Sequence, residues 1–330
     1  MKRLHLLFLS LLFTLATAQT DLEIGYMPIL PVSQVFVNVG EGYFDEAGIT
    51  PELIEFQNGA AIVQALSAGQ LDAAYVGIGP VMVANANGVN IKVVAASVKE
   101  QISFIARGRL AQYFTEDRTV AEAFQRYIDM EGERAQIVTF PSGTVPETVL
   151  QFWLASEGVQ PEQVEILFMG NAQVQQALLT DAVDAASILE PVVSVALNRL
   201  DDAEVLASGG ELFADQPGAV LVVRDELISE NSEAVQALVD MHIRSTDILT
   251  TDPERAAAHV AEFVGGGRLE QAVLVSALTN MQAKFVADPG AIQAGTRTMH
   301  DFQAEVGTLK NEVPLDELFD TSFFEGSSAR

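Results

Sequence analysis

The chain has 330 residues, 49% of them hydrophobic, which is enough for about two domains with sizeable cores. Its formal charge of −27 at pH 7 makes nucleic acid and anionic lipid poor partners, because both are negatively charged themselves. It has no cysteine, which excludes a disulfide framework, thiol catalysis and a lipid attached through an N-terminal cysteine. We expect no nucleic-acid partner and no insertion into a membrane.

Residues 1–18 have the pattern of a secretory signal peptide. Lys2 and Arg3 precede an apolar run over residues 4–15, and Ala16-Thr17-Ala18 has the small residues of a cleavage site. No later apolar run approaches the roughly 18 residues that a membrane span needs. We therefore expect export, cleavage after Ala18, no lipid anchor and a periplasmic location.

Strands and helices alternate at short spacing over residues 19–102. Alternating apolar residues predict a strand over 22–26, which is followed by a loop and a helix from Val35 to about Gly42. Further strands are predicted over 51–56, 71–76 and 91–97, with helices over 60–67 and from the Pro80 turn to Asn87. This order predicts a mostly parallel sheet flanked by helices.

Residues 59–76 are echoed by residues 171–188. The two segments align without gaps, and the matches include Asp72-Ala73-Ala74 with Asp184-Ala185-Ala186. Chance is one explanation, since Ala and Leu are common, but each copy also follows a strand and precedes a turn with proline. We interpret the echo as two lobes of one α/β design, in which 139–154 is the counterpart of 27–39.

The chain is expected to pass between the lobes twice. We assign 19–102 to the first part of lobe 1, 103–217 to lobe 2, and 218–330 to the return to lobe 1 and the C-terminal helices. The strands over 103–106 and 220–223 are the crossing strands, which would form a hinge. The polar stretch 109–136 is an insertion without an assigned role, and the tail from Leu309 is predicted to be loop-like.

The turn Ser142-Gly143-Thr144 stands between a strand that stops at Pro141 and the start of a helix. Glu147 follows Thr144 at capping-box spacing. Free N–H groups, two hydroxyls and the positive end of a helix dipole would suit an anionic group of a ligand. Helix capping alone is the alternative, and the symmetry of the lobes favours ligand contact, because it places this turn at the mouth of the cleft.

Ligands of open α/β sheets bind outside the carboxyl ends of the strands, and with two lobes that crevice lies between them. Glu190 ends an apolar strand there, and either contacts an amino or ring N–H group of the ligand or has a capping or hinge role. The predicted ligand-binding residues are Met27, Ser33, Gln34, Asn58, Gly77, Ile78, Gly79, Ser142, Gly143, Thr144 and Glu190.

No catalytic or metal-binding pattern is present in the sequence. His242, His259 and His300 lie within helical patterns and lack the spacing of metal ligands. The sequence also lacks a nucleophile elbow, a P-loop and a dinucleotide-binding fingerprint. We expect no cofactor, no metal and no enzymatic activity.

Four motifs together resemble the nitrate/sulfonate/taurine group of periplasmic substrate-binding proteins, which is also called NMT1/THI5-like. The motifs are Tyr26-Met27-Pro28, EGYFDEAGI over 41–49, AGQLDAAYVG over 68–77, and Ser187-Ile188-Leu189-Glu190-Pro191. The resemblance implies the two-lobed clamshell fold of type II periplasmic binding proteins. It also implies a monomer that delivers a small solute, with an anion such as a sulfonate, nitrate or taurine favoured, to an ABC permease and its ATPase.

Two alternatives stay open beside this interpretation. One is an enzyme on the same clamshell fold, although the sequence offers no acid/base cluster for it. The other is a binding protein for a heteroaromatic vitamin precursor, which would need stacking surfaces. The candidates for such surfaces are Tyr26, Tyr43, Phe44 and Tyr75.

Overall fold

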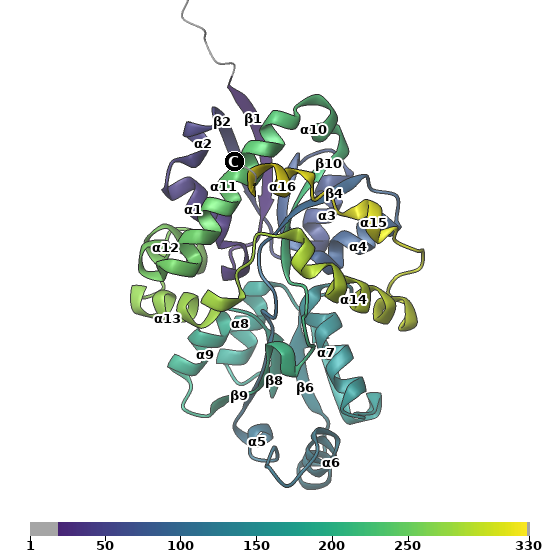
Figure 1. Ribbon diagram of the computed structural model, residues 1–330. Helices are drawn as coiled ribbons and strands as arrows, with labels where there is room; N and C mark the ends of the chain where they lie inside the picture. Colours follow the sequence, from purple (N-terminus) through teal and green to yellow (C-terminus); the bar gives the residue numbers. More distant parts are fainter. Residues whose placement is uncertain (1–18, 329–330) are drawn as a thin grey trace, which may run out of the picture.

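The computed structural model describes residues 19–328, and the predicted signal peptide over 1–18 lies outside this range. Two α/β lobes lie one above the other in Figure 1. Each lobe is built on a five-stranded sheet with helices on its faces. The strand orders are β2-β1-β3-β10-β4 in lobe 1 and β7-β6-β8-β5-β9 in lobe 2.

Lobe 1, at the top of Figure 1, is formed from both ends of the chain. Its strands are β1 (Thr20–Tyr26), β2 (Ile49–Glu55), β3 (Ala73–Gly77), β4 (Ile91–Ala96) and β10 (Ala219–Arg224). Its helices are α1 (Ser33–Gly40), α2 (Tyr43–Glu46), α3 (Gly59–Ser67), α4 (Ile78–Ala86), α10 (Asp225–Glu230), α11 (Ser232–Thr251), α12 (Pro253–Val260), α13 (Gln271–Met281), α14 (Gln293–Glu305), α15 (Leu315–Leu318) and α16 (Ser322–Ser328).

Lobe 2 contains the middle of the chain. Its strands are β5 (Ser103–Arg107), β6 (Ala135–Thr139), β7 (Val164–Phe168), β8 (Ala185–Ile188) and β9 (Ala203–Ser208). Its helices are α5 (Gly108–Ala111), α6 (Val120–Glu131), α7 (Val145–Ser156), α8 (Asn171–Leu179) and α9 (Val192–Arg199). The polar insertion forms α5 and α6, which lie at the end of lobe 2 that is remote from lobe 1 (Figure 1).

The two sheets share one design, which confirms the interpretation of the internal echo. β1, β2 and β3 pair in parallel in lobe 1, as β6, β7 and β8 do in lobe 2. One antiparallel strand follows in each sheet, β10 in lobe 1 and β5 in lobe 2. The echoed aspartates also act alike: Asp72 accepts the N–H of Glu23 (2.9 Å), and Asp184 accepts the N–H of Gln136 (2.8 Å).

Two connecting segments carry the chain between the lobes, residues 97–102 outward and 209–218 on return. They pair through the isolated bridge of Lys99 with Pro217, and we call the two segments together the ribbon. The N–H of Gly218 donates to the carbonyl of Val98 (3.1 Å), and that of Glu100 donates to the carbonyl of Gln216 (2.9 Å). A Cβ atom on Gly218 would lie 2.5 Å from the oxygen of Val98, so only glycine allows the two chains to approach so closely. The predicted crossing strands correspond to β5 and β10. Each of them lies within a sheet, and the chain crosses between the lobes in the segment just before each strand.

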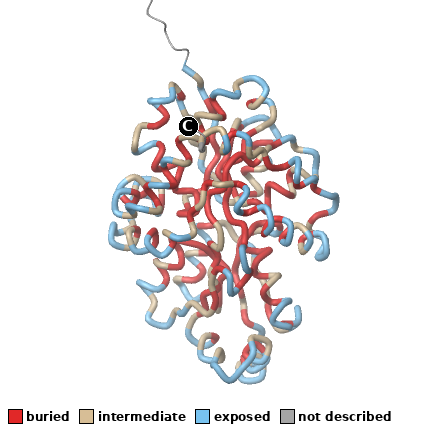
Figure 2. Tube along the Cα trace, in the orientation of Figure 1, coloured by how far each residue is buried: buried red, intermediate tan, exposed pale blue. Residues whose placement is uncertain are grey.

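Buried residues run through both sheets and across their junction, while exposed residues cover the rims (Figure 2). The C-terminal tail joins this core, so the prediction that it is loop-like was wrong. Leu318 in α15 and Phe323 in α16 are buried, and the amide of Gln236 in α11 donates to the carbonyl of Phe323 (3.0 Å). No helix within residues 19–328 combines the length and apolar character of a membrane span.

Candidate ligand-binding cleft

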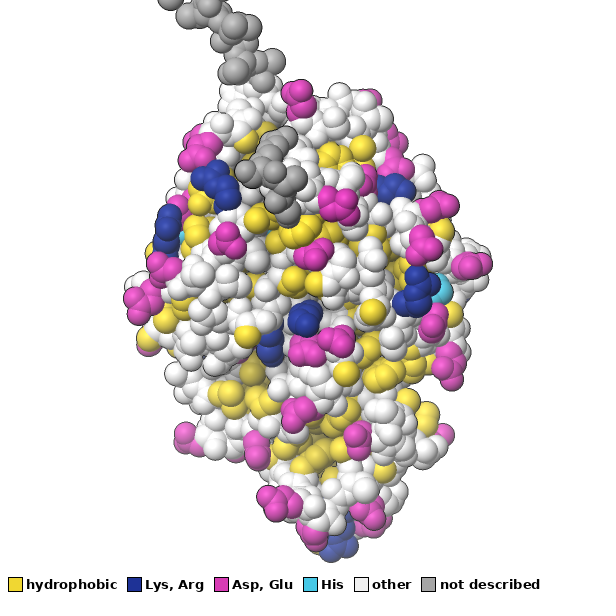
Figure 3. Space-filling model, in the orientation of Figure 1, with side chains coloured by type: hydrophobic (Ala, Val, Ile, Leu, Met, Phe, Trp, Pro, Cys, Tyr) yellow, Lys and Arg dark blue, Asp and Glu magenta, His cyan; other side chains and the backbone are white. Residues whose placement is uncertain are grey.

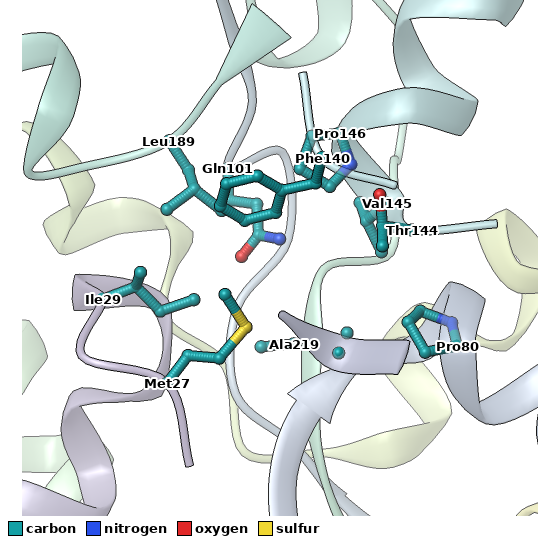
Figure 4. Close-up of a pocket in the computed structure, with 12 residues that line it drawn as sticks. Met27, Ile29, Pro80, Gln101, Phe140, Thr144, Val145, Pro146, Leu189 and Ala219 are labelled. Atoms are coloured by element: carbon teal, nitrogen blue, oxygen red, sulfur yellow. The ribbon is translucent and has the colours of Figure 1, made fainter. Parts of the chain in front are cut away.

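A cleft lies at the junction of the lobes, where β1 and β3 of lobe 1 and β6 and β8 of lobe 2 end. Each of these parallel strands supplies wall residues just past its carboxyl end, which is where open α/β sheets bind ligands. Figure 4 shows these residues around the cleft. The wall consists of Met27, Ile29, Gly59, Gly77, Pro80, Gln101, Phe140, Thr144, Val145, Pro146, Leu189 and Ala219.

The lobes touch across this cleft. The N–H of Leu30 in lobe 1 donates to the carbonyl of Glu190 in lobe 2 (3.2 Å), and the N–H of Asn171 donates to the carbonyl of Gln57 (3.2 Å). The cavity between the walls has a volume of about 20 Å³, room for about one water molecule. The lobes are therefore in contact across the cleft, and the cavity between them is too small for a solute much larger than one water molecule.

Gln101 contributes a buried side-chain amide to this wall, and it is not among the ligand-binding residues predicted from the sequence. It lies on the ribbon between β4 and β5, is 6% exposed, and its Oε1 atom has no hydrogen-bond partner. Figure 4 shows its amide inside the ring of side chains formed by Met27, Ile29, Phe140 and Leu189. No sequence signal distinguished Gln101, because it ends no parallel strand and belongs to no turn motif.

The Ser142-Gly143-Thr144 turn begins α7, as predicted, but the hydroxyl of Thr144 and the N–H of Gly143 are engaged within the protein. The Thr144 hydroxyl donates to the carbonyl of Pro141 (2.7 Å), and the Gly143 N–H donates to the Glu147 carboxylate (3.0 Å). The expected capping box therefore does not form, because Glu147 reaches past Thr144 and the Thr144 hydroxyl turns back to Pro141.

Only Thr144 of this turn borders the cavity that contains Gln101. Ser142 and Gly143 border a neighbouring groove, and Pro80 and Thr144 form the partition, since they contribute to both walls. The other residues of that groove are Ala60, Val63, Gln64, Val83 and Asn87.

Three more of the predicted residues lie at or beside the cavity. Met27 and Gly77 contribute to its wall. Gly79 lies where the lobes are closest, since a Cβ atom on it would be 2.5 Å from the carbonyl oxygen of Gly143. Their role in ligand binding stays a prediction.

The remaining predicted residues of lobe 1 do not border the cavity. The Ser33 hydroxyl donates to the carbonyl of Leu30 (2.6 Å), and the Gln34 amide donates to the carbonyl of Ser97 at the start of the ribbon (2.8 Å). Asn58 caps α3 by accepting the N–H of Ala61 (3.0 Å), and the side chain of Ile78 is buried in the core. These contacts give each side chain a structural role.

Glu190 follows β8 and is 8% exposed, but it does not border the cavity. Its carboxylate accepts hydrogen bonds from the backbone N–H (2.9 Å) and the hydroxyl (2.8 Å) of Ser194 in α9. Burial raises the pKa of the Glu190 carboxyl, because the low-dielectric surroundings disfavour its charged form. Both carboxylate oxygens thus have protein partners, as the predicted capping role requires.

The aromatic residues proposed as stacking surfaces lie elsewhere. Tyr75 and Phe44 are buried in lobe 1, and the guanidinium of Arg244 covers the ring of Tyr43 at 3.6 Å. Tyr26 packs edge-on against another core ring. Phe140 supplies the aromatic ring of the cavity wall.

Two lobes of the same topology, joined by a paired crossing and facing each other across strand ends, form the clamshell fold of periplasmic-type binding proteins. The profile of the NMT1-like family matches residues 16–265. The chain belongs to the NMT1-like family.

Relatives and solved structures agree with this assignment. A Brucella abortus protein provisionally named a binding protein is 27% identical over an alignment 328 positions long, which covers 96% of each chain. The fold matches that of the alkanesulfonate-binding protein SsuA from Xanthomonas axonopodis pv. citri bound to MOPS, with a TM-score of 0.74, 19% identity, and coverage of 93% of this chain and 100% of the other. It also matches the nitrate-binding protein NrtA from Synechocystis, with a TM-score of 0.77, 14% identity, and coverage of 94% and 89%.

Proposed function

We propose that this protein is the periplasmic solute-binding component of an ABC importer, which captures a small solute between its lobes and delivers it to a permease and its ATPase. The observation that carries the proposal is the cleft at the strand ends of two lobes that are joined by a paired ribbon. Such a ribbon lets the lobes part and close as rigid bodies. Closure buries the solute and presents one combined surface for delivery.

The relatives support the importer partners. The chain is 24% identical over 245 residues to a nitrate import ATP-binding protein of Synechococcus elongatus, which spans 37% of that longer protein. The family and the structural neighbours are substrate-binding proteins rather than enzymes. Export with cleavage after Ala18, a periplasmic location and a monomeric state belong to the same proposal.

Thermal unfolding with the small-molecule fraction of a bacterial cell extract tests the proposal. A solute that binds only the folded protein stabilises it by about 2.7 kcal/mol at a hundred times its Kd. We expect the extract to raise the melting temperature, and dialysis to restore the original value. An extract that leaves the melting temperature unchanged at every dose would contradict a solute-binding function.

A further inference from the structure

The cleft has the chemistry of a site for a neutral molecule. From its walls we infer that the solute is an uncharged, largely apolar small molecule that carries an N–H or O–H hydrogen-bond donor. This inference rests on the proposed function and narrows its substrate class.

The walls offer no charge to pair with a charged solute. Among the residues that the structure describes, none that borders the cavity or the neighbouring groove is ionisable. The cavity side is mainly aliphatic, proline and phenylalanine surface, with Gln101 and Thr144 as its polar side chains. A charged group enclosed there would lose its hydration without an opposite charge to replace it, which is strongly unfavourable.

The helix starts beside the cleft are poor anion sites, although helix N-termini often bind anions. Pro80 in the first turn of α4 and Pro146 in the first turn of α7 each remove one backbone N–H. The N–H of Ile78 at the start of α4 already donates to the carbonyl of Gly218 (3.0 Å). These two helix starts therefore offer an oxyanion fewer backbone donors than starts without proline would.

The ionisable groups nearest the cleft also disfavour an anion. Glu147 is 4% exposed and accepts the N–H of Gly143, so a carboxylate already occupies the anion position of that turn. Glu190 lies beyond the wall, where the charge of Lys284 acts to lower the pKa of its carboxyl against the larger effect of burial. A cationic solute gains nothing either, since both carboxylates have protein donors and neither borders the cavity.

The side chain of Gln101 indicates which polar group the solute carries. Its Oε1 atom is buried without a partner, and a buried acceptor without a partner is costly. A solute N–H or O–H group would satisfy it, while the amide N–H₂ group of Gln101 can donate to an adjacent solute oxygen. The remaining wall would enclose the apolar part of the same molecule.

Ion exchange of the stabilising extract tests the inference without knowledge of the solute. The extract fraction that raises the melting temperature is passed over a cation exchanger at neutral pH and then over an anion exchanger at pH 11, where a zwitterion such as taurine has lost its ammonium charge and is retained as an anion. We expect the stabilising activity to flow through both resins. Retention on either resin would overturn the neutral class while leaving solute binding intact, whereas an extract inactive before ion exchange would defeat the proposed function and this inference with it.

Substitution of Gln101 tests the contact itself. Gln101→Leu should lower the affinity for the flow-through fraction about tenfold, measured as the dose of extract that gives half the maximal thermal shift. Gln216→Leu is the matched control, because Gln216 is also a buried glutamine of the ribbon but does not border the cavity. Equal doses for the two variants and the wild type would overturn the role of Gln101. If Gln101→Leu fails to fold, Gln101→Met serves instead, since it keeps the length of the side chain without the acceptor oxygen and should lower the affinity by the same factor.

Discussion

At the scale of single residues, the buried carboxylate of Glu147 holds the turn that precedes α7. It accepts the N–H of Gly143, and the Gln151 amide donates to its other oxygen (3.3 Å). Burial is the main cause that raises the pKa of Glu147, and these hydrogen bonds act in the opposite direction. The side chain therefore links the stability of lobe 2 to pH.

Glu147→Gln should remove this pH dependence. The folded pKa of Glu147 lies above its unfolded value, so its contribution to stability is fully present below the unfolded pKa and is lost as the pH rises through the folded pKa. As the pH rises from about 4 to 7, the melting temperature of the variant should therefore rise relative to that of the wild type. If the difference in melting temperature between the variant and the wild type stays constant over this pH range, Glu147 is not the source of the pH dependence. Thermal unfolding at a series of pH values measures it.

Glu190→Gln separates a capping role from a contact with the solute. In the variant, an N–H₂ group replaces one of the two carboxylate oxygens that accept hydrogen bonds from Ser194. A donor then faces a donor, so the free energy of unfolding should fall by about 1 kcal/mol. The affinity for the stabilising extract should stay unchanged, because Glu190 does not border the cavity. Denaturant unfolding and extract titration measure the two quantities. Unchanged stability with lost affinity would instead place Glu190 in contact with the solute.

The sequence predicted residues at strand ends better than it predicted their contacts. Met27, Gly77 and Thr144 border the cavity because they follow parallel strands, and the strand pattern can be read along the chain. The use of the Gly143 N–H by Glu147 depends on the path of the turn in space, which capping-box spacing does not determine. Gln101 owes its place to the pairing of two distant segments, so no local pattern could reveal it.

At the scale of elements, the aspartate before the central strand recurs in both lobes with different surroundings. Asp184 accepts from the backbone N–H of Gln136 and from the hydroxyl of Tyr127 (2.9 Å) in a half-buried position. Asp72 accepts the N–H of Glu23 at an exposed position. The aspartate is thus more buried and accepts more hydrogen bonds in lobe 2 than in lobe 1.

Alanine at the two aspartates should therefore have unequal effects. Asp184→Ala removes two half-buried hydrogen bonds to a charged acceptor and should lower the free energy of unfolding by about 3 kcal/mol. Asp72→Ala should cost about 1 kcal/mol, because water can replace its exposed contact. Urea unfolding of both variants gives the comparison, and equal losses would show that the surroundings do not matter.

Gly79→Ala should hold the lobes apart. Alanine suits the first turn of α4, so lobe 1 should keep its stability, but its Cβ atom would lie 2.5 Å from the carbonyl oxygen of Gly143. We expect a larger radius of gyration in small-angle X-ray scattering and a weaker thermal shift with the extract. Gly170→Ala is the control, because it lies at the same junction but its Cβ atom would be no nearer than 3.5 Å to its neighbours. Equal radii for the two variants would rule out this blocking effect.

Most elements were predictable because their patterns are local. The strand predicted over 22–26 lies within β1, and the helix predicted over 60–67 lies within α3. The tail was missed because α15 and α16 are short and depend on packing against lobe 1 rather than on their own periodicity. Short helices of this kind are marginal without tertiary contacts, so a sequence pattern alone does not indicate them.

At the scale of the whole molecule, acidic side chains dominate. The chain has 45 Asp and Glu against 18 Lys and Arg, and acidic side chains are scattered over the face seen in Figure 3. Like charges at this density repel one another and oppose the compact state. The same field opposes the approach of an anionic solute, which agrees with the uncharged walls of the cleft.

Sodium chloride should therefore stabilise the protein. Screening shortens the range of repulsion to about 10 Å at 0.1 M salt and about 3 Å at 1 M, so the melting temperature should rise over this range. Potassium chloride should give the same curve, because screening depends on ionic strength and not on the identity of the cation. A falling melting temperature, or different curves for the two salts, would contradict an effect of general charge.

β10 lies between β3 and β4 in the sheet of lobe 1. This position determines which of the two sheets can be completed first while the chain is synthesised. The sheet of lobe 1 lacks a central strand until the chain has been made as far as Arg224, although its other four strands end by Ala96. All five strands of lobe 2 lie in one uninterrupted stretch, whose end residues Ser103 and Ser208 pair with each other. The second lobe can thus be finished first, and the lobe that begins the chain is closed last.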